Sequence, residues 1–316
     1  MRVLVTGGFG FIGSRTARAL ISKEYEVGVL DDLSTGDSAS LPSQVESHIG
    51  DIREYGFVQR VVREYDAVVH EAAIVSVQKS VEDPLTVSAV NIEGTLNLLR
   101  ASAKAKVRKF VFASSAAVYG GGEALPKTEH MRPEPMSPYA VSKAASEYYC
   151  AAFAKVYGLQ TVVLRYFNVY GPGQKGGEYS GVIPTFIRRA SRGKPPVIYG
   201  DGEQSRDFVH VDDVASANVL ALERDVPAAE IFNIATGTPV TVNQLARLVV
   251  RSAGKPGLKP VHAPSRAGDI LDSYADIGRA KKLLGYSPKF TIEGGLPSVI
   301  EWMRKIGERG MKKTLR

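Results

Sequence analysis

The first thirteen residues restrict the possible folds more than any other part of the sequence. Arg2–Thr6 is a short apolar run, and a helix-length segment, Phe11–Ser22, follows it closely. Gly7 and Gly10 lie between these two segments, and Gly13 lies just inside the second, so the three glycines are spaced three residues apart. Glycines at this spacing allow a tight turn and a close approach of the backbone to a pyrophosphate, which the N-terminus of the helix then attracts. The segment predicts a dinucleotide site at the first strand-to-helix turn.

The following 150 residues alternate short apolar runs with helix-length segments. Further strands are predicted at residues 26–30, 45–49, 67–70, 109–113 and 160–165. The longest helical stretches are residues 84–104 and Pro138–Tyr157. Continuous apolar strands that alternate with helices are typical of βαβ units around a buried parallel sheet. We therefore expect an α/β fold, in which a doubly wound, parallel-sheet Rossmann domain is joined to a smaller α/β substrate domain.

The domain boundary is expected where this alternation stops. After residue 168 the chain becomes rich in Gly and Pro, and the strand–helix pattern returns only near residues 208–235. We predict that residues 1–168, plus about 208–235, form the dinucleotide-binding domain. Residues 169–207 and 236–316 would form the substrate domain.

Composition narrows the class of protein. Hydrophobic residues make up 44% and charged residues 23% of the 316 residues, which is typical of a globular protein. The single cysteine, Cys150, excludes a disulfide within one chain and disfavours a metal site, so we expect no metal. No apolar run approaches the ~18–20 residues of a membrane span, and the start of the chain lacks the pattern of a signal peptide. We expect a cytoplasmic protein with no membrane partner.

The net charge of +7 comes largely from the end of the chain. Residues 301–316 contain six basic and two acidic side chains, so this tail contributes +4. No helix-turn-helix pattern or aromatic RNA-binding signature accompanies the charge. We interpret the tail as a solvated surface and expect no nucleic-acid partner.

Asp31, which follows the second predicted strand, indicates which dinucleotide binds. A carboxylate there can accept hydrogen bonds from ribose hydroxyls and would repel a 2′-phosphate. Residues 31–40 contain no Arg or Lys that could neutralise such a phosphate, so NAD is favoured over NADP. Asp51 and Ile52, after the third strand, could flank the adenine, although Asp51 could equally cap a helix. The residues expected to contact the cofactor are Gly7, Gly10, Phe11, Ile12, Gly13, Asp31, Asp32, Ser34, Gly36, Asp51, Ile52, Ala72, Ala73, Tyr139 and Lys143.

Tyr139 and Lys143 are the candidate catalytic pair. They are four residues apart in a predicted helix and therefore project from one face. A nearby ammonium stabilises a phenolate, so the pair could take a proton from a substrate hydroxyl. Ser115 stands at the end of the fifth predicted strand, the edge at which α/β sheets bind ligands, and could hydrogen-bond the same oxygen. We predict a catalytic triad of Ser115, Tyr139 and Lys143.

Several motifs in a fixed order complete the pattern. They are TGGFGFIG at residues 6–13, HEAA at 70–73, AAVYG at 116–120, SPYAVSK at 137–143, RYFNVYGP at 165–172, RDFVHVDDV at 206–214 and RAGD at 266–269. Over essentially the whole chain these resemble the extended short-chain dehydrogenases of the NAD-dependent epimerase/dehydratase family. The resemblance implies NAD as the cofactor and a nucleotide sugar as the substrate.

The resemblance also implies roles for residues outside the triad. Phe167 and Asn91 match residues of the cofactor site, although Asn91 could simply cap or bridge helices. The positions that match substrate-binding residues of the family, in addition to Ser115 and Tyr139, are Ser76, Val77, Asn168, Arg206, Arg266, Asp269 and Ser273. Guanidinium groups suit a diphosphate, but either arginine alone could equally form a surface ion pair.

The reaction implied is 4-epimerisation of a UDP-hexose, which interconverts UDP-galactose and UDP-glucose through a 4-keto intermediate. Dehydratases and decarboxylases of the family carry acidic residues just after the catalytic hydroxyl residue, where this chain has Ala116 and Ala117. The small Ser273 would leave room for an N-acetyl group at carbon 2. Alternatives are UDP-N-acetylglucosamine or UDP-glucuronate as the substrate, although the sequence places no cation for a glucuronate carboxylate.

A different class of function is a non-catalytic NAD-binding sensor on the same fold. The intact triad disfavours it, because such sensors usually lose Tyr or Lys of the pair. The resemblance further implies a homodimer built from the helix after Pro84 and the helix of Tyr139. Tyr148, Tyr149, Ala152 and Phe153 suit such burial, although they could equally face the protein's own sheet.

Overall fold

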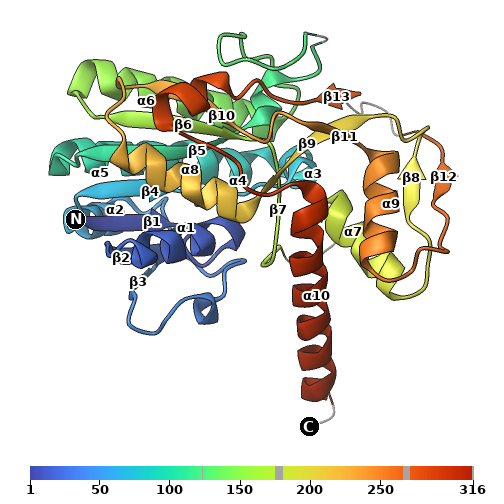
Figure 1. The fold of residues 1–316 in the computed structure, drawn as a ribbon. Helices are drawn as coiled ribbons and strands as arrows, with labels where there is room; N and C mark the ends of the chain where they lie inside the picture. Colours follow the sequence, from blue (N-terminus) through green and yellow to red (C-terminus); the bar gives the residue numbers. More distant parts are fainter. Residues whose placement is uncertain (123, 175–180, 266–270, 315–316) are drawn as a thin grey trace.

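A seven-stranded parallel sheet forms the centre of the molecule (Figure 1). The computed structural model describes residues 1–122, 124–174, 181–265 and 271–314, with side chains up to residue 306. The strands lie in the order β10-β6-β5-β4-β1-β2-β3. Their bounds are β1 Arg2–Thr6, β2 Glu26–Asp31, β3 Glu46–Ile49, β4 Ala67–His70, β5 Lys109–Ser115, β6 Thr161–Tyr166 and β10 Glu230–Ile234. This confirms the doubly wound α/β fold, and its strand order reverses direction between β1 and β4, where such sheets bind ligands.

Helices cover both faces of this sheet. Helices α1 (Phe11–Ser22) and α8 (Val211–Glu223) pack together on one face. Helices α2 (Tyr55–Val62), α5 (Gly94–Ala105) and α6 (Pro138–Tyr157) cover the other. Successive strand residues point to opposite faces, so Val3 and Val5 join the α1/α8 core while Leu4 joins the α2/α5/α6 core. The near-continuous apolar strands of the sequence follow from this burial on both sides.

Helix α6 has the bounds that the sequence predicts, because both of its ends are encoded locally. The Ser137 hydroxyl accepts a hydrogen bond from the Ala140 N–H at 3.2 Å, and Pro138 occupies the first turn. At the other end Gly158 adopts a left-handed conformation with φ +67°. These signals fix the register of the helix that carries Tyr139 and Lys143.

The helical stretch expected over residues 84–104 is present, with one irregular turn inside it. The chain stays helical, but α4 (Pro84–Ser88) and α5 are joined by a π-helical turn, η2 (Ala89–Glu93). A π-turn inserts one extra residue and often marks a functional site. Here the inserted turn contains Asn91, whose side chain is buried.

A second, smaller lobe is built on a four-stranded sheet. Strand β9 (Ser205–His210) pairs with β7 (Asn168–Tyr170), β11 (Pro239–Thr241) and β13 (Asp272–Ser273), while β8 (Val197–Tyr199) pairs with β12 (Val261–Ala263). Helices α7 (Val182–Ser191), α9 (Val242–Ser252) and α10 (Ile292–Thr314) form its core with these strands. The chain therefore rejoins the large sheet through α8 and β10, and β9 lies in the smaller sheet rather than in the Rossmann part.

The remaining short elements connect these layers. They are α3 (Val77–Glu82), the 3-10 turns η1 (Ser38–Ser40) and η3 (Ala116–Tyr119), and the π-turn η4 (Ala280–Leu284). Helix α10 extends away from the body of the molecule toward the C-terminus (Figure 1). In the described part of the chain, none of the helices has both the length and the apolar character needed to cross a membrane.

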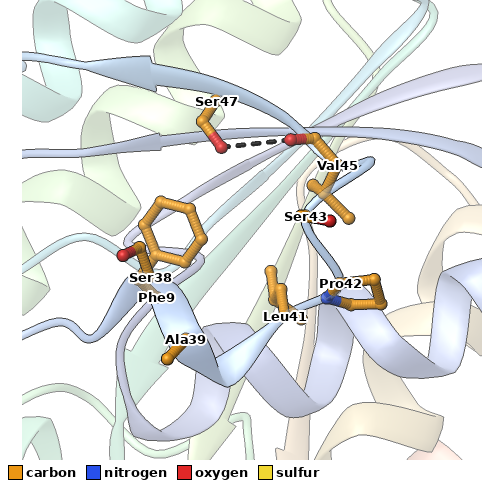
Figure 2. Close-up of a pocket in the computed structure, with 8 residues that line it drawn as sticks. All are labelled: Phe9, Ser38, Ala39, Leu41, Pro42, Ser43, Val45 and Ser47. Atoms are coloured by element: carbon orange, nitrogen blue, oxygen red, sulfur yellow. Dashed lines mark hydrogen bonds between the residues drawn. The ribbon is translucent and has the colours of Figure 1, made fainter.

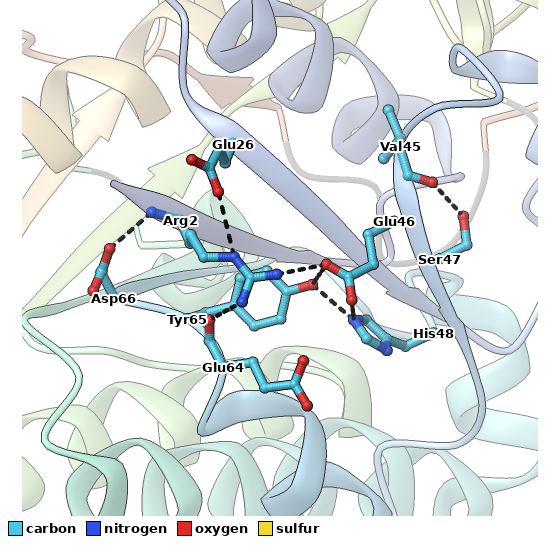
Figure 3. A network of polar contacts seen from close by, with 9 residues as sticks. All are labelled: Arg2, Glu26, Val45, Glu46, Ser47, His48, Glu64, Tyr65 and Asp66. Atoms are coloured by element: carbon cyan, nitrogen blue, oxygen red, sulfur yellow. Dashed lines mark hydrogen bonds and ion pairs between the residues drawn. The ribbon is translucent and has the colours of Figure 1, made fainter.

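A polar network ties together the N-terminal ends of the first strands (Figure 3). The Arg2 guanidinium lies 2.7 Å from the Glu46 carboxylate and 3.5 Å from that of Glu26. The Tyr65 hydroxyl donates to Glu46 at 3.2 Å and lies 2.7 Å from the His48 ring. The network anchors β3, the edge strand, to β1 and β2 at the end opposite the ligand crevice.

Candidate active site

The glycine-rich turn after β1 forms a cradle that side chains would fill. Gly7 has φ +65°, and a Cβ atom there would lie 2.7 Å from the backbone nitrogen of Ala72. A Cβ on Gly13 would lie 2.1 Å from the carbonyl oxygen of Gly7. Because α1 begins at Phe11, its N-terminus points at this cradle. The turn therefore fits the diphosphate of a dinucleotide.

Asp31, at the end of β2, is nearly buried beside this turn. Its Oδ2 accepts a hydrogen bond from the Phe9 N–H at 3.0 Å, and its Oδ1 accepts one from the Leu33 N–H at 2.8 Å. A Cβ on Gly36 would lie 2.8 Å from Asp31 Oδ1, so the following loop packs closely on the carboxylate. A carboxylate at the end of this strand is the group that accepts hydrogen bonds from ribose hydroxyls in dinucleotide-binding folds. The neighbouring Asp32 accepts from the N–H and hydroxyl of Ser34 in a tight turn.

A hollow of about 380 Å³ adjoins the loop after β2 (Figure 2). Its lining residues are Phe9, Ser38, Ala39, Leu41, Pro42, Ser43, Val45 and Ser47. Phe9 lines this hollow and also belongs to the glycine-rich turn, where its N–H donates a hydrogen bond to Asp31. None of the predicted catalytic residues lines it, so it lies outside the chemical centre.

Asp51, Ile52 and Asn91 take up contacts within the protein. The Asp51 carboxylate accepts from the backbone and guanidinium of Arg53, and α2 begins after Glu54, so Asp51 does not cap that helix. Ile52 is buried in the core beneath α5. Asn91 bridges the structure: its Oδ1 accepts from the Ile74 N–H at 2.8 Å, and its Nδ2 donates to the Ile74 carbonyl at 3.0 Å. Asn91 thus shapes the loop after β4.

Ser115, Tyr139 and Lys143 meet at the carboxyl end of β5. Tyr139 and Lys143 lie on α6 and are buried, while Ser115 ends β5 and starts η3. The Ser115 hydroxyl lies close enough to the Tyr139 phenol to lower its pKa. Lys143 Nζ donates to the carbonyl oxygen of Ala113, two residues before Ser115, at 2.8 Å. The structure therefore brings the three predicted residues together.

The pKa shifts of Tyr139 and Lys143 differ from the expectation that the Lys143 ammonium stabilises a Tyr139 phenolate. Burial raises the pKa of Tyr139, and only the Ser115 hydroxyl opposes this, because the Lys143 amine is turned toward Ala113. Burial also lowers the pKa of Lys143 to about 8, against the opposing charges of Glu71 and Glu147. A phenolate at Tyr139 therefore requires further positive charge beside it.

Glu147 and Arg165 form a buried ion pair beneath this site, which the sequence analysis missed. Arg165 Nη2 lies 2.7 Å from Glu147 Oε2, and Arg165 Nε lies 2.9 Å from Oε1. The Ser114 hydroxyl donates to the same carboxylate, and the Arg165 guanidinium lies over the Tyr119 ring. The pair joins α6, β5 and β6 directly behind Ser115. An arginine inside the apolar run of β6 was the available signal.

Glu71, just after β4, is a second residue that the analysis did not single out. Its Oε1 accepts hydrogen bonds from the Tyr166 hydroxyl at 2.9 Å and the Asn218 amide at 2.8 Å. Burial raises the pKa of this carboxyl to about 7, although both hydrogen bonds and Lys143 oppose the shift. The signal was a charged residue within HEAA, directly after an apolar strand.

The residues expected at the substrate lie on the smaller lobe and its border. Ser273 on β13 is paired in register with Arg206 on β9, and Arg206 Nη1 donates to the carbonyl oxygens of Ser205 and Leu271. The Asn168 amide donates to the Asp207 carbonyl at 3.2 Å. Arg266 and Asp269 lie outside the described residues. Arg206, Asn168 and Ser273 are therefore linked through β9.

Three further expected site residues follow strands of the large sheet. The Ser76 hydroxyl accepts from the Lys79 N–H at 3.0 Å and caps α3, which Val77 begins with an exposed side chain. Phe167 is buried in the core, with its ring 6.2 Å from that of Tyr119. Ser76 and Val77 come after the carboxyl end of β4, and Phe167 comes directly after the carboxyl end of β6.

The family model described as the NAD dependent epimerase/dehydratase family matches residues 3–235. The chain belongs to this family. A putative UDP-glucose 4-epimerase of Methanocaldococcus jannaschii is 38% identical, over 96% of this chain and 98% of that protein. A UDP-glucuronate 4-epimerase of Thermodesulfobacterium geofontis is 33% identical over 96% of each. The cofactor of this family enzyme is NAD.

Solved structures agree with the fold and differ in their ligands. A UDP-glucose 4-epimerase of Thermotoga maritima with UDP-glucose is 41% identical, with a TM-score of 0.92 over 97% of this chain and 99% of that one. A UDP-N-acetylglucosamine 4-epimerase of Methanobrevibacter ruminantium, in complex with UDP-N-acetylmuramic acid, is 37% identical, with a TM-score of 0.92 over 96% and 98%. A Thermus thermophilus UDP-glucose 4-epimerase with NAD is 40% identical, with a TM-score of 0.87 over 96% and 99%. The chain is a family enzyme related to epimerases of UDP-sugars.

Proposed function

We propose that the protein is a 4-epimerase that interconverts UDP-galactose and UDP-glucose through a 4-keto sugar. The observation that carries the proposal is the meeting of Ser115, Tyr139 and Lys143 at the carboxyl end of β5, on the same edge of the sheet as the glycine cradle. A hydroxyl group held there would lie within reach of a proton acceptor. The similarity to epimerases of UDP-glucose supports the same reaction.

Bound NAD supplies a reversible acceptor for the hydride at carbon 4. Tyr139 would remove the proton from the 4-hydroxyl and later return it, while the Ser115 hydroxyl orients the same oxygen. The Lys143 ammonium would supply part of the positive charge that Tyr139 needs, because burial alone holds the phenol in its neutral form. Each group is restored at the end of a turnover.

Residues after Ser115 favour epimerisation over elimination. The turn η3 begins with Ala116 and Ala117, and neither side chain can remove a second proton from the sugar. Simple oxidation and re-reduction at carbon 4 needs no such base. The proposal therefore favours epimerisation over dehydration and decarboxylation for this chain.

The choice of sugar is proposed from the smaller lobe. Arg206, Arg266, Asp269 and Asn168 would hold the UDP moiety, and Ser76 and Val77 would lie beside the sugar. Ser273 is aligned with Arg206, and its small side chain would leave space for an acetamido group at carbon 2. UDP-N-acetylhexosamines are therefore proposed as additional substrates, and relatives that act on N-acetylated and glucuronate sugars make both worth testing.

The direct test uses the purified protein without added NAD. Incubation with UDP-galactose is expected to yield UDP-glucose. Tyr139→Phe is expected to lose about 10²-fold or more in kcat, as loss of an acid–base group does. Tyr148→Phe, an exposed tyrosine on the same helix, is the matched control and should retain full activity. NAD bound without turnover of any of the UDP-sugars would instead support a sensor.

We further propose a homodimer that uses the outer face of α6. Tyr148 is 63% exposed there, and Leu85 on α4 and Val81 on α3 are 82% and 65% exposed on helices that pack against α6. Phe153, in contrast, is buried in the protein's own core. Exposed apolar groups concentrated on adjoining helices are typical of an interface.

Light scattering after size-exclusion chromatography tests this dimer. Tyr148→Glu is expected to give a monomer with an unchanged circular dichroism spectrum. Val261→Glu, at an exposed apolar position on β12, is the control and should remain dimeric. A wild-type monomer at micromolar concentration would contradict the proposal.

A further inference from the structure

Glu71 lies where the strand order of the sheet reverses. Its N–H donates to the carbonyl of Thr6 at 3.1 Å, and a Cβ on Gly7 would lie 3.0 Å from its carbonyl carbon. The carboxylate is held from below by the Tyr166 hydroxyl on β6 and the Asn218 amide on α8. Glu71 is therefore fixed beneath the crevice between β1 and β4, beside the glycine cradle, and the mechanism above does not use it.

The register of the sheet places Glu71 next to the contact of Lys143. His70, the last residue of β4, is paired with Phe112 on β5, and Glu71 and Ala113 directly follow this pair at the carboxyl ends of the two strands. The Ala113 carbonyl accepts the hydrogen bond from Lys143 Nζ. Glu71 and the Lys143 ammonium thus lie at the same end of adjacent strands, in a low-dielectric interior where charges act over several ångströms.

Glu71 is the carboxylate near Lys143 whose charge is left uncompensated. Glu147 lies one helical turn beyond Lys143, but its charge is matched by the two hydrogen bonds from Arg165. None of the ion pairs formed by the described residues includes Glu71. Its hydrogen-bond donors, Tyr166 and Asn218, are neutral. Its charge therefore acts on Lys143 as well as on the neutral Tyr166.

The other titratable groups around the two side chains stay in one form. Burial lowers the pKa of His70, on β4, to about 3, so its ring is neutral. Burial raises the pKa of the Cys150 thiol on α6 and of the Tyr166 phenol on β6, so both keep their protons. Of the groups named, Glu71 and Lys143 are left to change charge near neutral pH.

We propose that Glu71 is a positioning residue for the proton transfer at Tyr139: its carboxylate keeps Lys143 an ammonium at the reaction centre. The proposal rests on the roles proposed above for Tyr139 and Lys143. When the carboxylate is removed, Lys143 loses its proton at lower pH, because the charge that favours its ammonium form is gone. The phenol of Tyr139 then loses the positive charge that it needs.

The test replaces Glu71 by the isosteric Glu71→Gln, which keeps an acceptor for Tyr166 and Asn218. The NMR signal of ¹³Cε-labelled Lys143, assigned through its loss in Lys143→Arg, reports the titration without reference to activity. We expect the midpoint to fall by about one pH unit, as for loss of a nearby opposite charge. In the pH profile of kcat, the decrease on the basic side should shift to lower pH by the same amount. We therefore expect kcat to be up to about tenfold lower at pH 8.5 and little changed at pH 6.5. The KM for UDP-galactose should be unchanged.

Two further variants separate charge from packing. Thr95→Val disturbs the buried contact of His70 on the opposite face of β4, and it should leave the Lys143 midpoint unchanged. Glu71→Asp keeps the charge, loses the hydrogen-bond geometry and should titrate close to wild type. An unchanged midpoint in Glu71→Gln, or the same fall in the Asp or Val variant, overturns the proposal. A shifted midpoint in a protein that converts no UDP-sugar would refute the epimerase function and leave the role of Glu71 in the Lys143 titration standing.

Discussion

Tyr139 is a phenol that burial holds in its protonated form, while Asp31 is a carboxylate that two backbone N–H groups hold in place. At the scale of single residues, the surroundings of each group therefore set its protonation state or fix its position. The glycine-rich turn after β1 also depends on single residues, because its cradle can form only where side chains are absent.

Gly13→Ala is expected to abolish retention of NAD. The new Cβ would lie 2.1 Å from the Gly7 carbonyl oxygen, so the turn would have to open. The NAD content of the purified protein, measured after denaturation, should fall to near zero. Gly158→Ala is the control: its φ of +67° costs about 1–2 kcal/mol, but a Cβ there meets nothing within 4 Å, and NAD should stay bound. Equal NAD content in both variants would contradict the cradle.

Asp31→Asn should weaken NAD binding about tenfold or more, since hydrogen bonds to a charged group are worth about 1.5–3 kcal/mol. The loss of the carboxylate also removes the repulsion of a 2′-phosphate, so the preference for NAD over NADP should narrow. Calorimetric titration of cofactor-free protein with each dinucleotide measures both effects. An unchanged preference would show that Asp31 does not select the cofactor.

At the scale of elements, the site depends on how α6 is attached to the sheet. Its start and end were predictable because Ser137, Pro138 and Gly158 are local signals. Its attachment to β5 and β6 through Glu147 and Arg165 was not, since the partners are 18 residues apart and their pairing depends on the packing of α6 across both strands. The π-turn at Asn91 was missed for a related reason: sequence periodicity shows helix but not the insertion of one residue.

Glu147→Gln is expected to destabilise the protein by about 3–5 kcal/mol, because it leaves the Arg165 charge buried without its partner. The double variant Glu147→Met, Arg165→Met removes both charges and should recover much of that loss. Chemical denaturation at pH 7.5 gives the free energies of unfolding. A single variant as stable as wild type would show that the pair does not hold α6.

At the scale of the whole molecule, the chain combines a sheet that binds NAD with a lobe built on β9. The large sheet was predictable from its apolar strands, and the proximity of Ser115, Tyr139 and Lys143 was predictable from spacing along one helix and from one strand end. The lobe was predicted only in outline: β9 lies within the smaller sheet because its partners, β7, β11 and β13, come from distant segments. Glu71 was overlooked because its hydrogen-bond partners, Tyr166 on β6 and Asn218 on α8, are distant in the sequence.

The most direct test of the account follows the hydrogen at carbon 4. UDP-galactose that carries deuterium at this carbon is incubated with the purified protein, and the UDP-glucose formed is analysed by mass spectrometry and NMR. The account predicts nearly complete retention of deuterium at carbon 4, because the same hydride leaves and returns within one active site. Loss of the label to solvent during conversion would contradict it.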